Sequence, residues 1–142
     1  MSLGTFGAVM GFASEMVRRS MQFYRSGVEK AKDPILKEAL QLLGQEESRN
    51  CSLLEQTRRE NVTEMILEPI TGLKPEDYEM AVGLSPDGGD EELFKAALVM
   101  EEREQRFFQD SSQKIPLPEV ARVFRKAARK KEENLAKLIS LR

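Results

Sequence analysis

Four long segments of the chain repeat apolar residues at intervals of three and four, and this spacing constrains the fold more than any other feature. Such spacing gathers one stripe of side chains on one face of an α-helix. The segments span about 6–31, 34–59, 90–114 and 118–141, and prolines begin the second and the fourth. Proline suits the first turn of a helix and disfavours helix before it. The sequence therefore predicts two helical hairpins with tight turns before Pro34 and Pro118.

The stretch between the two hairpins, residues 60–89, has a different character. It is rich in proline and glycine, and the segment 85–89 has the composition of a turn. A short helix is predicted to start at Lys74-Pro75-Glu76-Asp77 and to run through Val82. Thirty residues are enough to cross the length of a bundle, so we expect an all-α fold in one domain, residues 1–142. The predicted architecture is a four-helix bundle of two antiparallel hairpins joined by one long crossover.

An internal repeat supports this architecture. Shifting the chain by 84 residues without gaps superposes residues 16–54 on 100–138. Seven of these 39 positions are identical, and Pro34 falls on Pro118 and Asn50 on Asn134. Because the coincidences include the proline between helices and residues of the inward stripes, the repeat indicates two equivalent hairpins.

Composition excludes several classes of function. The chain of 142 residues contains no histidine and one cysteine, Cys51. Most zinc sites, serine and cysteine triads and any internal disulfide are thereby ruled out. A lone cysteine favours a reducing compartment, and we expect the cytoplasm. Cys51 itself is interpreted as a small apolar filler.

Two other segments bear on possible partners. The apolar stretch 3–13 is too short to span a bilayer and lacks the flanks of a signal peptide, so no membrane association is expected. The basic run 125–131 interrupts an apolar helical pattern in a slightly acidic chain, net charge −2. It is interpreted as a solvated helix face, and no nucleic-acid partner is expected.

Polar residues occupy positions of the inward stripes where a bundle should be apolar. A buried carboxylate needs a cation, a metal or a proton to offset its desolvation. One interpretation is an ion-pair network around Lys131 in which a glutamate stays protonated. The other is a single hard divalent ion held by three carboxylates and two asparagine carbonyls. The residues of this polar seam are Glu47, Asn50, Glu101, Glu104, Lys131 and Asn134, together with Tyr24, interpreted as a hydrogen-bonded core tyrosine.

Four segments carry a resemblance to a known family. Phe12-Ala-Ser-Glu-Met-Val17-Arg-Arg-Ser-Met-Gln-Phe-Tyr24 resembles the first helix of the rubrerythrin branch of the ferritin-like superfamily. The segments 43–54, 100–108 and 131–138 resemble its second, third and fourth helices. The resemblance implies a ferritin-like bundle with a di-iron site at its centre.

Residue by residue, this chain departs from the family's ligand pattern. The first ligand position is Val17, which cannot bind metal. The positions that correspond to the remaining ligands are Glu47, Asn50 in place of histidine, Glu101, Glu104, Lys131 in place of glutamate, and Asn134 in place of histidine.

Only three of the seven ligands implied by the resemblance are therefore present. Two irons need about four carboxylates and favour imidazole as well. Val17 and Lys131 remove two carboxylates, and Lys131 adds a positive charge. We therefore expect no catalytic residues, no resident cofactor and none of the family's peroxidase or oxidase activity. No Cys-x-x-Cys pairs of a rubredoxin module are present either.

The sequence leaves three classes of function open. The first is a non-catalytic bundle or interaction protein, expected to form a homodimer. The second is a metal-binding oxidoreductase of the rubrerythrin type with a single divalent metal or a residual di-iron site. The third is a small-ligand binder that uses the polar seam.

Overall fold

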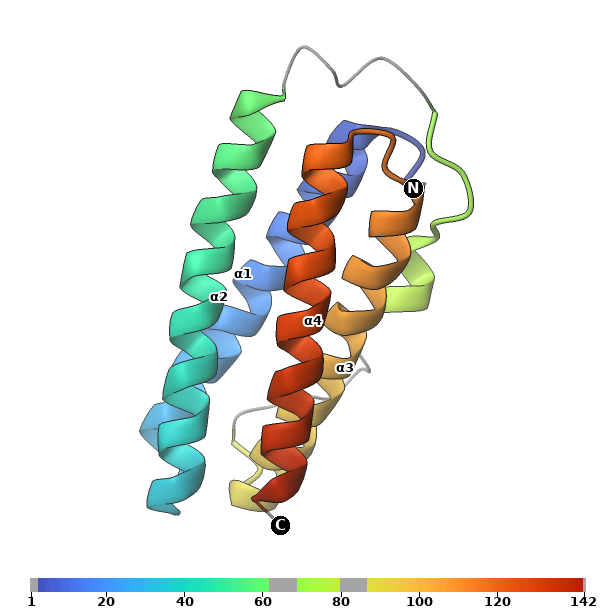
Figure 1. Cartoon of the computed structure of the whole chain (residues 1–142). Coiled ribbons are helices and arrows are strands. Elements are labelled where there is room, and N and C mark those ends of the chain that lie inside the picture. Colours follow the sequence, from blue (N-terminus) through green and yellow to red (C-terminus); the bar gives the residue numbers. More distant parts are fainter. Residues whose placement is uncertain (1–2, 62–68, 80–86, 142) are drawn as a thin grey trace.

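A computed structural model describes residues 3–61, 69–79 and 87–141, and over these residues the chain is all-helical with no strand. The long helices are α1 (Phe6–Lys30), α2 (Pro34–Glu60), α3 (Asp90–Lys114) and α4 (Pro118–Ser140), and η2 (Pro75–Tyr78) is a short 3₁₀ helix (Figure 1). Every predicted bound of a long helix lies within one residue of the observed one. The prediction of an all-α fold with four long helices is confirmed.

The turn between α1 and α2 follows from local capping chemistry. The Asp33 carboxylate accepts a hydrogen bond from the Ile35 amide at 3.0 Å, and Pro34 occupies the first helical position. The Asp90 carboxylate, at the start of α3, accepts bonds from the amides of Lys32 and Asp33 at 2.9 Å each. These two bonds lower the pKa of Asp90. The second hairpin is thereby joined to the turn of the first.

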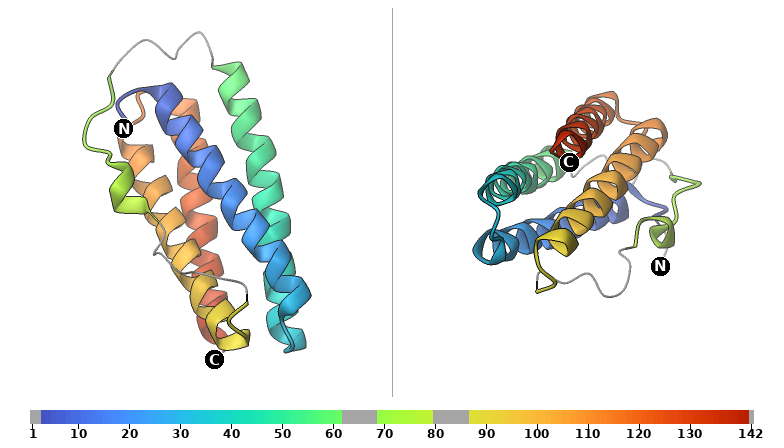
Figure 2. Two further views of the ribbon diagram at one scale, coloured as in Figure 1. Left: turned by 180° about the vertical axis from the view of Figure 1, so that it is seen from behind. Right: turned by 90° about the horizontal axis from the view of Figure 1, so that it is seen from below.

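The four long helices pack as two pairs. The helices of each hairpin, α1 with α2 and α3 with α4, run antiparallel and side by side (Figures 1 and 2). Seen along the bundle, α1 lies beside α3 and α2 lies beside α4. Since α2 and α3 run in the same direction, the segment that joins them leads from one end of the bundle to the other. Parts of this predicted crossover, residues 62–68 and 80–86, lie outside the described residues.

The short helix in the crossover differs from its prediction. It begins at Pro75, within the predicted start 74–77, but it is a single 3₁₀ turn that ends at Tyr78, because Glu79 has extended backbone (φ −72°, ψ 144°). Residues 80–82 of the predicted helix lie outside the described residues. The buried Tyr78 ring packs against Phe107 with ring centroids 5.2 Å apart, and its hydroxyl donates to Asp110. One anchored side chain, not an amphipathic stripe, positions this segment.

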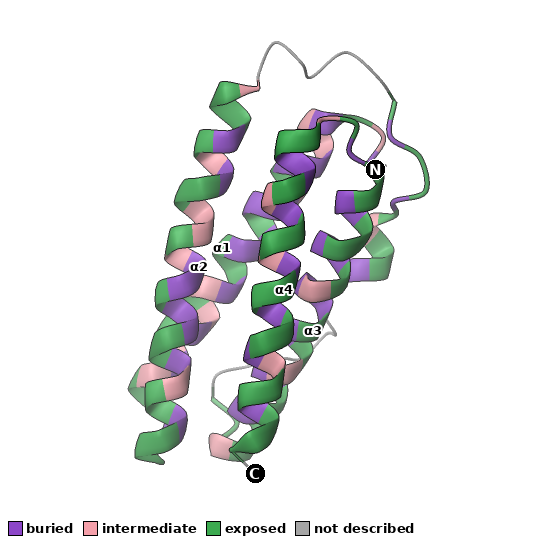
Figure 3. Cartoon of the chain, in the orientation of Figure 1, coloured by how far each residue is buried: buried purple, intermediate pink, exposed green. Residues whose placement is uncertain are grey.

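Buried residues recur along each long helix, interrupted by exposed ones on its outer side (Figure 3). All residues of the predicted inward stripes are buried, except Asn50 and Ala127, which are half-buried. The apolar ones form two clusters, one around Phe107 and Phe124 and the other around Leu40 and Met100. Along every long helix, polar residues lie between the two clusters. None of the helices described is both long enough and apolar enough to cross a membrane.

Candidate functional site

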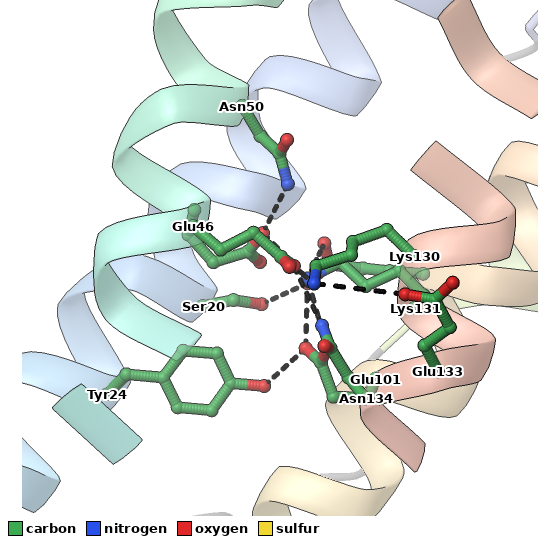
Figure 4. Close-up of polar contacts among 11 residues, drawn as sticks. Ser20, Tyr24, Glu46, Asn50, Glu101, Lys130, Lys131, Glu133 and Asn134 are labelled. Atoms are coloured by element: carbon green, nitrogen blue, oxygen red, sulfur yellow. Dashed lines mark hydrogen bonds and ion pairs between the residues drawn. The ribbon is translucent and has the colours of Figure 1, made fainter. Parts of the chain in front are cut away.

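All four long helices contribute side chains to one buried polar layer in the middle of the bundle (Figure 4). One turn of each helix provides them, because the inward stripes of all four helices change from apolar to polar at the same level. The polar layer consists of Ser20 and Tyr24 from α1, Glu46 and Glu47 from α2, Glu101 and Glu104 from α3, and Lys131 and Asn134 from α4.

The ammonium group of Lys131 is surrounded by carboxylates. Its Nζ lies 2.8 Å from Glu47 Oε1, 3.0 Å from Glu46 Oε2, 3.0 Å from Glu101 Oε2 and 3.6 Å from Glu104 Oε1, and the side chain is 0% exposed. Burial works to lower the pKa of Lys131, but the surrounding carboxylates outweigh it and hold the pKa well above its usual value. Lys131 is therefore charged at any physiological pH.

One ammonium does not balance four carboxylates, which together with it carry −3 when all are ionised. Burial raises the pKa of Glu47 well above its usual value, and repulsion from Glu104 adds to the rise. Burial also raises the pKa of Glu101. Buried Glu47 Oε2 and Glu104 Oε1 accept no hydrogen bond from the described residues. A proton on Glu47 supplies a donor for Glu104 and removes one negative charge from the layer.

The other polar groups of the layer donate to the carboxylates. The Ser20 hydroxyl donates to Glu104 at 2.6 Å, and the Tyr24 hydroxyl donates to Glu101 at 2.7 Å. The Asn134 amide donates to both Glu46 and Glu101 at 2.8 Å. Burial, followed by repulsion from these carboxylates, raises the pKa of Tyr24 well above its usual value. Tyr24 is thus a protonated, hydrogen-bonded tyrosine of the core.

The predicted site residues do not all lie at equal depth. The structure brings Tyr24, Glu47, Glu101, Glu104, Lys131 and Asn134 together, all of them buried. Asn50 is half-buried at the edge of the layer, where its amide donates to Glu47 at 2.9 Å. Asn50 and Asn134 both present an NH₂ group to a carboxylate, so neither offers a carbonyl oxygen there as a metal ligand would.

Two further positions singled out by the sequence lie near the layer without joining it. Val17, at the ligand position that the resemblance assigns to glutamate, is fully buried in the apolar cluster around Phe107. Cys51 is a half-buried free thiol packed against the same cluster, and burial raises its pKa. A thiol with a raised pKa is less of a thiolate at neutral pH, which fits an apolar filler.

Ser20 and Glu46 belong to the layer but not to the predicted polar seam, and Glu46 also lies off the predicted inward stripe. When a single inward stripe is assumed for α2, Glu47 lies on the inner face and Glu46 lies beside it, away from the stripe. A helix in a bundle has two neighbours, however, so its buried face is wider than one stripe. The spacing of Leu43, Glu46 and Asn50, at intervals of three and four, contains this second stripe. It places Glu46 on the side of α2 that meets α4.

Residues that are equivalent in the internal repeat contact each other in this layer. Ser20 bonds to Glu104, and Glu47 pairs with Lys131, and each pair is separated by 84 residues, the offset of the repeat. Two equivalent groups can meet only close to the axis that relates the two hairpins. The polar layer therefore lies where the two halves of the chain meet.

Comparisons of the chain with family models, with curated proteins and with solved structures found no match. What the site can bind is therefore inferred from the side chains of the polar layer. One carboxylate oxygen from each of Glu47, Glu101 and Glu104 lies within 4.8 Å of the other two, a set that could hold one divalent ion. The Lys131 ammonium, which contacts all three, does not fit such an ion because both are cations.

We expect Lys131→Met to destabilise the fold by about 3–5 kcal/mol, because it leaves buried carboxylates without their cation. Urea unfolding at neutral pH measures the loss. Lys130→Met, at the exposed neighbouring position, is the matched control and should change the free energy of unfolding by less than about 0.5 kcal/mol. Equal curves for the two variants would show that Lys131 does not hold the layer together.

The raised pKa of Glu47 predicts a pH dependence. The stability contributed by its proton is complete below the unfolded pKa of glutamate, about 4.3, and is lost as the pH rises through the higher folded pKa. Glu47→Gln keeps a neutral donor at every pH. Its free energy of unfolding should therefore rise relative to that of the parent between about pH 5 and pH 8.

Thermal and urea unfolding across that range measure this difference. Glu133→Gln, at an exposed position on α4, is the matched control for the removal of a carboxylate. A Glu47→Gln difference that stays constant with pH would mean that Glu47 is ionised throughout.

Proposed function

We propose that the chain is a divergent member of the rubrerythrin-like branch of the ferritin-like superfamily that works as a non-catalytic bundle. In this proposal the ammonium of Lys131 replaces the metals as the internal cation. The observation that carries it is the set of four carboxylates within 3.6 Å of Lys131 Nζ. An ammonium attached to the chain holds the layer together without supplying redox chemistry.

Further observations support the absence of di-iron chemistry. The chain has no histidine, and the position that would supply a carboxylate from α1 is the buried Val17. The amides of Asn50 and Asn134 donate hydrogen bonds to the carboxylates. Two irons would meet the four carboxylates around Lys131, but no imidazole and a fixed positive charge, and this donor set does not suit them.

The partner that we propose is a second copy of the chain, in the cytoplasm, and not nucleic acid or a membrane. A groove of about 460 Å³ runs between α2 and α4. Two of its apolar side chains are unusually exposed, Ile35 at 60% and Leu42 at 59%. Both signs of charge border the groove, which allows two copies to pair symmetrically. The charged residues are Glu38, Glu46, Arg49, Lys130 and Lys137.

The oligomeric state tests this surface. Light scattering after gel filtration at about 100 µM should give a dimer for the parent chain and a monomer for Leu42→Lys. Leu53→Lys, which changes an exposed leucine of α2 outside the groove, should remain dimeric. A monomeric parent, or a Leu42→Lys variant as dimeric as the control, would overturn this part of the proposal.

A metal-binding oxidoreductase, with one divalent ion or a residual di-iron site, is the second candidate. The clustered oxygens of Glu47, Glu101 and Glu104 favour the single ion, as do the two carboxylate oxygens without a donor. Under our main proposal the purified parent carries no stoichiometric metal. One manganese or iron per chain would instead support a single-metal protein, and two irons a di-iron one.

Lys131→Glu tests the exchange of cation directly. Without metal it should unfold at a lower temperature than the parent, because it adds a fifth carboxylate and removes the ammonium. Added Mn²⁺ should restore a large part of the loss, since hard divalent ions bind clustered carboxylates. Lys130→Glu makes the same change of charge at the exposed neighbour and should show no such rescue. Equal responses of the two variants to Mn²⁺ would contradict the proposal.

A further inference from the structure

Two basic side chains among the described residues are buried, Lys131 and Arg103, and they differ in what surrounds them. Lys131 has four carboxylates. Arg103, on α3, is 5% exposed, and its Nε and Nη2 donate no hydrogen bond to any described residue. Burial lowers the pKa of Arg103, but a guanidinium stays protonated in proteins. A charged group with two unmade hydrogen bonds is thus buried in the interior of the bundle.

The two unpaired nitrogens lie on the same edge of the guanidinium. Nε–H and one N–H of Nη2 point the same way, and together they form the fork that a carboxylate accepts with both oxygens. No acceptor in the described chain takes either hydrogen bond. Two acceptors placed side by side in the plane of the guanidinium would complete these bonds. The two oxygens of a carboxylate have this arrangement.

Arg103 lines a pocket of about 370 Å³ between α1, η2 and α3. Phe12, Met16 and Tyr78 also line the pocket and give it an apolar surface. The position of Tyr78 is set by its hydroxyl bond to Asp110 and by Phe12, whose ring centroid is 6.4 Å away. The pocket therefore combines rigid apolar surface with one buried cation, and its volume is typical of a small-ligand site.

The remaining lining residues restrict the charge of a ligand. Glu15 and Glu79 line the pocket beside Arg19. Glu15 is already paired with Arg19 at 2.9 Å, whereas Glu79 is exposed. Because Arg19 offsets the charge of Glu15, Glu79 is the carboxylate that repels a doubly charged anion such as phosphate more strongly than a singly charged one. A ligand with one negative charge and an apolar body is favoured.

We propose that this pocket binds a small monocarboxylate with an aromatic or branched aliphatic body, held through the Nε and Nη2 edge of Arg103. The carboxylate supplies the two acceptors that the guanidinium lacks, and the body packs against Phe12, Met16 and Tyr78. The proposal is independent of the polar layer, since it requires neither a metal nor a change in Lys131.

Benzoate is a suitable probe because its ring and carboxylate match the two parts of the pocket. Titration of the full chain up to about 10 mM benzoate, followed by NMR, should shift the signals of Phe12, Met16 and Tyr78 in a saturable way. Benzamide, which has the same shape without the charge, and inorganic phosphate should bind at least about tenfold more weakly. Shifts confined to the groove between α2 and α4, or no saturable shifts at all, would overturn the proposal.

Variants test the role of the guanidinium. Arg103→Lys keeps the charge and loses the fork, so we expect affinity for benzoate to fall about tenfold or more while the fold is retained. Arg103→Met should abolish binding. Arg122→Lys, at an exposed position on α4 outside the pocket lining, should bind benzoate like the parent. Equal affinity of the parent and Arg103→Lys would show that the apolar walls alone bind the probe and would refute the assignment.

Discussion

The contact of the Lys131 ammonium with four buried glutamates is the interaction on which the rest of the bundle depends. Taking these charges out of water is costly, and the cost is offset only while the carboxylates and the ammonium stay together. The apolar clusters on either side would tolerate small shifts of one helix along another. The layer would not, because each donor of α1 and α4 has to meet its own carboxylate on α2 or α3. The polar layer therefore sets the register of the four helices.

How much could be predicted from sequence depended on the range of the interactions. The helix bounds follow from prolines, caps and the three-and-four spacing, which are local, and they were predicted to within one residue. The end of η2 depends on where the Tyr78 ring packs, and the burial of Glu46 depends on how α2 meets α4. Neither contact follows from the single inward stripe that predicts each helix. Local spacing does not settle whether Lys131 points inward either, because a long lysine stem on the inner face can also reach solvent.

An ammonium limits what a layer of carboxylates can do more than divalent ions would. Divalent ions neutralise several carboxylates and leave coordination positions for substrate, whereas the ammonium carries one charge and uses its three hydrogens on the carboxylates. The remaining negative charge is reduced when Glu47 holds a proton, which follows from its raised pKa. The chemistry of the polar layer is that of a structural layer with a titratable proton.

The Lys131 ammonium is surrounded by carboxylates, and this directs attention to the other buried cation. Arg103 lies one residue before Glu104 on α3, yet two of its nitrogens donate no hydrogen bond within the described part of the chain. An unpaired buried donor costs about 1–3 kcal/mol, and more when it is charged. A fold that could place a carboxylate beside Lys131 could also have placed one beside Arg103. The chain surrounds Lys131 with four carboxylates, but at the pocket it leaves Nε and Nη2 of Arg103 without a described acceptor. We therefore assign ligand binding to Arg103 and stabilisation of the bundle to Lys131.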